Sequence, residues 1–175
     1  MRLYTTIALL ATTLATTAAS AHAGSPSTDS RARTSGTLRA SVDSLRIATS
    51  IAEAERFAVA GRTGEARRRY RAVIEEQRAN GDSPARTLWL MATSYYADGD
   101  EVSAARTLDA AAAAASEYGD PEAELRATFE AAVLYASNRM PEQVAPRLER
   151  VRRLLKSPAI APEQRQSIER RIAKR

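Results

Sequence analysis

The stretch YYADGDEVSAARTL, residues 95–108, decides the fold. The two tyrosines end one helix-forming segment, and Gly99-Asp100 follows as a turn. Glycine commonly ends a helix, and aspartate commonly caps the next one. Alanines then lead to Leu108 in a second helix-forming segment. The stretch therefore predicts two helices joined by a short turn, and such helices pack as antiparallel neighbours.

The same spacing occurs three times. In each segment an aromatic residue is followed, 4, 9, 13 and 16 positions on, by a turn residue, a small residue and two apolar ones. The segments carry Phe57, Gly61, Ala66, Tyr70 and Val73; Tyr95, Gly99, Ala104, Leu108 and Ala111; and Tyr135, Arg139, Val144, Leu148 and Val151. Three positions before the aromatic residues lie Ala54, Ala92 and Ala132. A repeating helix-turn-helix unit is indicated, because one pair alone cannot bury its apolar face.

This pattern resembles the tetratricopeptide repeat over about residues 47–156. The resemblance implies an all-α, helix-turn-helix solenoid of about three antiparallel helix pairs plus a C-terminal helix. The units recur after 38 and 40 residues, a longer period than the 34 of that family. Arg139 and Val144 replace the usual glycine and alanine in the third unit, and Pro146 interrupts its second helix.

Periodicity and turn residues predict helices at about 38–60, 63–80, 84–97, 100–118, 121–137, 141–156 and 162–173. Pro146 should kink the sixth helix or delay its start. The predicted organisation is a signal peptide at 1–23, a disordered polar leader at 24–37, the repeat domain at 38–156 and a C-terminal capping helix at 157–175.

The N-terminus has the layout of a secretory signal peptide. Arg2 precedes an uncharged segment at 3–19, and Ala21 and Ala23 fit a small-x-small cleavage site. We therefore expect an exported protein, periplasmic or secreted, without a membrane span after cleavage. Retention of the segment as a membrane anchor is the alternative.

The residues available for chemistry are few. The chain has no cysteine, and His22 would leave with the signal peptide, which removes the common zinc ligands and nucleophile pairs. Without Arg2, 25 of the 26 basic residues remain against 21 acidic ones, and the two signs are interspersed. We expect no enzyme activity, no metal, no cofactor and no nucleic-acid partner.

The tetratricopeptide resemblance implies a concave groove that receives a peptide or a partner's helix. Its candidate residues are Glu55, Arg86, Trp89, Thr93, Tyr96, Arg126, Phe129 and Val133. Aromatic and arginine side chains dominate interface energetics, and this set suits a segment with apolar and acidic side chains. The lysine and asparagine clamp of chaperone-tail domains is missing. Trp89 and Phe129 have an alternative role, which is packing against adjacent helices or the seventh helix.

The expected function is therefore a non-catalytic protein-protein adaptor of the bacterial cell envelope. One alternative is a small envelope scaffold that forms homo-oligomers through its alanine-rich segment, 109–116, or its terminal helices. A remote alternative is a carboxylate enzyme acting on cell-wall polymer.

Overall fold

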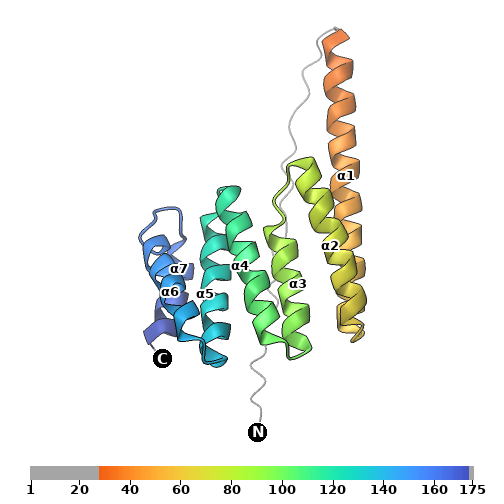
Figure 1. The fold of residues 1–175 in the computed structure, drawn as a ribbon. Coiled ribbons are helices and arrows are strands. Elements are labelled where there is room, and N and C mark those ends of the chain that lie inside the picture. The colour runs from red at the N-terminus through yellow and green to blue at the C-terminus, as the bar shows by residue number, and fades with distance from the viewer. Residues whose placement is uncertain (1–27, 174–175) are drawn as a thin grey trace. The chain divides into compact units, whose positions relative to one another are not determined.

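The computed structural model describes residues 28–173, with side chains at 42–172. This part of the chain is all-helical, as predicted, and contains no strand. The helices are α1 (Thr28–Val59), α2 (Thr63–Asn80), α3 (Ala85–Ala97), α4 (Glu101–Glu117), α5 (Pro121–Ser137), α6 (Pro141–Leu154) and α7 (Pro162–Ala173). Figure 1 shows their order along the chain.

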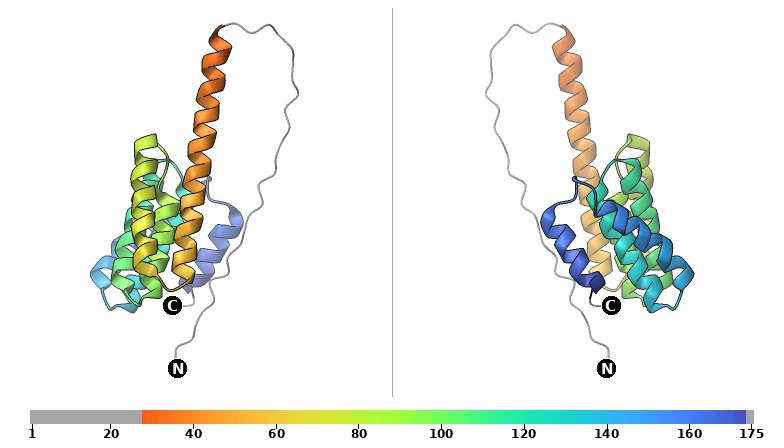
Figure 2. Two further views of the ribbon diagram at one scale, coloured as in Figure 1. Left: turned by 90° about the vertical axis from the view of Figure 1, so that its right-hand side faces the viewer. Right: turned by 90° about the vertical axis from the view of Figure 1, so that its left-hand side faces the viewer.

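Residues 39–175 form one compact unit in which consecutive helices pack side by side (Figure 1). The main packed pairs are α2 with α3, α3 with α4, α4 with α5, and α5 with α6; α3 also touches α5. Within this unit, α1 and α7 lie on one side and α2 and α6 on the other (Figure 2). Short turns thus join helices that alternate between two layers.

The turns of the three aligned segments have the same backbone conformation. Gly61, Gly99 and Arg139 have φ angles of 74°, 79° and 57°, in the left-handed region. In each turn the carbonyl oxygen of the aromatic residue accepts a bond from the amide five positions on: Arg62 to Phe57 at 2.9 Å, Asp100 to Tyr95 at 3.0 Å, and Met140 to Tyr135 at 3.0 Å. Arginine occupies at position 139 a conformation that glycine adopts at lower cost.

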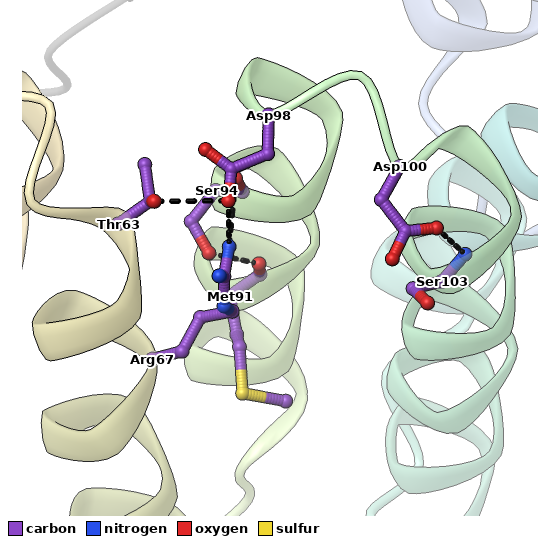
Figure 3. A network of polar contacts seen from close by, with 7 residues as sticks. All are labelled: Thr63, Arg67, Met91, Ser94, Asp98, Asp100 and Ser103. Atoms are coloured by element: carbon purple, nitrogen blue, oxygen red, sulfur yellow. Dashed lines mark hydrogen bonds and ion pairs between the residues drawn. The ribbon is translucent and has the colours of Figure 1, made fainter.

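Aspartates cap α4 and α5, as the sequence predicts. The Oδ1 of Asp100 accepts a hydrogen bond from the amide of Ser103 at 3.0 Å (Figure 3). Asp120 does the same for Ala123 at 3.0 Å. Both bonds satisfy amides that a helix start leaves without an intrahelical partner.

The start of the first helix differs from the prediction, and the start of the sixth agrees with it. The first helix begins at Thr28, so residues 28–37, expected in a disordered leader, are helical. Polar residues can continue a helix because its backbone hydrogen bonds are local. The sixth helix begins at Pro141, as predicted, so Pro146 does not delay its start. Pro141 suits the first turn, where the missing amide hydrogen has no intrahelical role. The predicted signal peptide lies outside the described residues.

Two groups of buried side chains hold the unit together. The larger contains small residues such as Ala54 and Ala92, which let helices approach, and larger ones such as Tyr70 and Leu88. The second contains Leu125, Phe129, Val151, Leu154, Ile160 and Ile168, from α5 to α7. The C-terminal helix therefore covers apolar side chains of α5 and α6.

Candidate functional site

Three of the predicted groove residues on α3 and α5 are exposed. Arg86 and Arg126 are exposed and occupy equivalent positions in the first helices of the second and third units. Tyr96, near the end of α3, is 48% exposed. Ten residues of helix separate it from Arg86, a rise of roughly 15 Å. The face thus has cationic groups toward one end and an aromatic ring toward the other.

Trp89 lies between these ends and is partly buried. Its indole Nε1 donates a hydrogen bond to Oε2 of Glu130 at 2.7 Å, which joins α3 to α5. The ring also packs against the larger apolar core. Trp89 is therefore both a packing residue and one edge of the candidate site.

The carboxylate of Glu130 is in an unfavourable environment for its charge. Burial raises its pKa above the ordinary range, while the Trp89 hydrogen bond and the positive charges of Arg126 and Arg171 oppose the shift. The hydrogen bond stabilises the charged form, because the indole can only donate. Glu130 was not among the predicted residues. Only the fold brings it to Trp89, which is 41 positions away in sequence.

Phe129 does not belong to an open surface, contrary to the groove prediction. It is 2% exposed and lies in the second core group. The guanidinium carbon of Arg171, on α7, is 4.6 Å from its ring centroid. Val133 packs against the same group. The two residues are covered because α7 folds back onto α5.

Thr93 and Glu55 are partly buried and have neighbours within the fold. The hydroxyl of Thr93 donates to the carbonyl of Leu90 at 2.6 Å, so it serves its own helix. Glu55 lies near Tyr70 on α2. Burial and, to a smaller degree, the negative charge of Glu55 raise the pKa of Tyr70 to about 12. The surroundings of Thr93 and Glu55 therefore give no indication of a ligand contact at either residue.

A polar network joins α2 to α3 (Figure 3). Arg67 donates to Asp98 at 2.6 Å, and the hydroxyl of Thr63 donates to the same carboxylate at 2.9 Å. These two donors hold the pKa of Asp98 below its usual range. Arg67 also lies 4.6 Å from the ring centroid of Tyr95. The network ties the turn after α3 to α2.

A second network joins α4, α5 and α6. The hydroxyl of Tyr135 donates to Asp109 at 2.9 Å, and Nε of Arg147 donates to the same carboxylate at 2.7 Å. Burial first, and then its bond to Asp109, raise the pKa of Tyr135. These hydrogen bonds tie α5 and α6 to the same carboxylate of α4.

Other candidate sites offer little chemistry. A hollow of about 360 Å³ between α2 and α4 is lined by Arg78, Pro84, Ala110, Ala113, Ala114, Glu117 and Tyr118. Within the described part of the chain, no cluster of three His, Cys, Asp or Glu side chains could hold a metal ion. In the same region no helix is both long and apolar enough to span a bilayer.

No protein-family model, curated protein or solved structure matches this chain significantly. The structure places Arg86, Trp89 and Tyr96 on α3 and Arg126 on α5, and it brings Glu130 to Trp89. Arg126 and Arg171 lie close enough to Glu130 to lower its pKa.

Proposed function

We propose that this protein is a non-catalytic adaptor of the bacterial cell envelope, built as a tetratricopeptide-like solenoid. It binds a segment of another protein on the face formed by α3 and α5. Export follows from the signal-like residues 1–23, and the absence of catalytic chemistry follows from the residue types that would remain after cleavage.

The stacking of equivalent residues supports the solenoid. Trp89 and Phe129 both lie six positions before the aromatic residue of their unit. Trp89 meets Glu130 of α5, the first helix of the next unit, while Phe129 meets Arg171 of α7. In this scheme α7 takes the place of a further first helix and caps the array.

The observation that carries the binding proposal is the exposure of Tyr96, Arg86 and Arg126 together on this face. A half-exposed tyrosine and two exposed arginines beside a tryptophan edge match the composition of interface centres. The arginines favour carboxylates in the partner. Tyr96 provides apolar contact area at low cost in conformational entropy.

Affinity capture from envelope extract tests the proposal. The bait is the wild-type protein, compared with a triple variant, Arg86→Glu, Tyr96→Ala and Arg126→Glu. All three side chains are exposed, so circular dichroism should show unchanged helicity. A variant with Arg68→Glu, Arg152→Glu and Tyr118→Ala is the matched control, because it makes the same changes at exposed positions elsewhere.

The proposal expects a protein captured by the wild type and the control but lost with the triple variant. Equal capture by all three baits would place the interface elsewhere and overturn the assignment of this face.

A further inference from the structure

The C-terminal helix α7 lies in an apolar cradle that α5 and the end of α6 form. The cradle consists of Leu125, Phe129, Val133, Val151, Leu154 and Leu155. Ile168 and Ile172 of α7 pack into it, and their spacing of four residues places them on one face of the helix. Many proteins bind a partner's amphipathic helix in such a groove, and here the bound helix belongs to the same chain.

Few contacts hold α7 in the cradle. Among the side chains described on α7, only Ile168 is buried, whereas eight residues are buried on α5. Docking also buries Oε1 of Gln164 and Nε of Arg165, which have no hydrogen-bond partner among the described residues. Buried polar atoms without partners destabilise the docked state, because water would bind them after release. The opening of α7 should therefore need less free energy than the opening of α5.

The chain before α7 is fixed more firmly than α7 itself. Ile160 is 2% exposed and belongs to the same core group as the cradle residues. Its amide donates to the carbonyl of Ser157 at 3.3 Å. The amide of Ala161 donates only to the exposed carboxylate of Glu122, at 3.0 Å. The helix that begins at Pro162 can therefore leave the cradle while Ile160 stays in place.

The side chains under α7 continue the proposed binding face. Phe129 has the same position in its unit as Trp89, and Val133 lies one helical turn further along α5. The guanidinium of Arg171 covers the Phe129 ring, with 4.6 Å between its carbon and the ring centroid. Release of α7 would expose an aromatic ring on the helix that also carries Arg126.

We propose that α7 is a displaceable cover of this face, and that the helix of a partner takes its place. In the free protein α7 closes the α5 part of the face. The partner helix has the chemistry of α7, which is two apolar side chains four positions apart on an otherwise polar helix. This regulation rests on the proposed function, because it acts on the same face.

A labelled peptide of residues 161–175 tests whether the cradle accepts a helix from outside the chain. In the full chain, Ile168→Asp with Ile172→Asp should release α7, and fluorescence anisotropy should then show binding of the peptide. The wild type should bind it at least about tenfold more weakly, because its own α7 competes from a short tether. Gln166→Asp with Ser167→Asp is the matched control, since both positions are exposed, and should behave as the wild type.

Two results of this titration would overturn the proposal. One is the absence of binding to the released variant up to about 1 mM peptide, the effective concentration that a short tether provides. The other is equal binding to the wild type and the released variant, which would place the peptide outside the cradle. Circular dichroism should show that the released variant loses no more helicity than α7 contributes.

Hydrogen exchange of the wild-type chain tests the opening of α7 without any substitution. Amides of α7 should exchange faster than amides of α5, because α7 opens locally. Equal protection of the two helices would show that α7 opens only with the whole fold, and would overturn the displaceable cover. Both assays use only this chain and its own peptide. Their failure therefore leaves the proposed face standing, whereas failure of the envelope capture would overturn that face alone.

Discussion

The turn residues Gly99 and Arg139 give the sharpest test of the repeat, because removing the side chain at position 139 and adding one at position 99 should change the stability in opposite directions. Both adopt left-handed backbone conformations, with φ of 79° and 57°. A residue with a Cβ costs about 1–2 kcal/mol more than glycine in this region. Glycine also gives the unfolded chain more conformational freedom, and this entropy offsets about 0.5–1 kcal/mol of that cost. Arg139→Gly should therefore stabilise the protein by about 1 kcal/mol.

Gly99→Ala should destabilise it by a similar amount. A Cβ built at Gly99 meets no atom within 4 Å, so the cost is conformational and not steric. In a chain of 175 residues, 1 kcal/mol corresponds to about 2–4 °C in melting temperature. Thermal unfolding followed by circular dichroism measures both shifts, and Arg139→Ala, which keeps the left-handed strain, is the control. A destabilising Arg139→Gly would refute the equivalence of the turns.

Three further predictions concern single contacts. Tyr135→Phe removes the hydrogen bond to Asp109 and should lower the free energy of unfolding by about 1 kcal/mol in urea titrations. Asp120→Ala removes the cap of α5 and should cost about 1 kcal/mol in the same assay. The fluorescence of Trp89, the single tryptophan, should change with pH as Glu130 titrates, with a midpoint above the ordinary glutamate range, and Glu130→Gln should abolish the change.

The burial of Glu130 also decides the direction in which pH changes the stability of the fold. The folded-state pKa of Glu130 is raised above its unfolded value. The folded state therefore binds the proton more tightly, and Glu130 favours folding most below its unfolded pKa. This contribution is lost as pH rises from that value through the raised folded pKa. In the Glu130→Gln variant, the free energy of unfolding should depend less on pH between the unfolded and the folded pKa of Glu130. A wild-type curve that rises with pH more steeply than that of the variant would contradict the assignment.

Controls separate local contacts from general damage. Tyr95→Phe changes the tyrosine equivalent to Tyr135, and its ring keeps the contact with Arg67. It should cost less than Tyr135→Phe. Asp120→Asn keeps a capping oxygen and should retain most of the stability that Asp120→Ala loses. Equal losses in either pair would show that the hydrogen bonds named above do not carry the effect.

Local signals in the sequence were sufficient for most helix bounds. Asp100, Asp120 and Pro121 act within one turn of chain, so their effects can be read without the fold. The start of α1 was missed because residues 28–37 have no apolar period, and a helix needs none to form its own hydrogen bonds.

The site was harder to predict, because burial depends on which helices stack. Phe129 has the same position in its unit as Trp89, and only the path of α7 decides that it is covered. Glu130 contacts Trp89 through the packing of α3 against α5, and no spacing rule within one helix reveals that bond. Arg86, Tyr96 and Arg126 are exposed, and they remain the residues proposed to contact a partner.

The central claim is that the face of α3 and α5 holds a protein partner, and photocrosslinking in living cells tests it most directly. A photoreactive phenylalanine analogue replaces Tyr96, which is 48% exposed, or Tyr118, which is 37% exposed and lies on α4. The account predicts a discrete crosslinked product from position 96, lost when Arg86→Glu and Arg126→Glu are added, and none from position 118. The same product from both positions, or a product from position 96 that survives the two arginine changes, would contradict it.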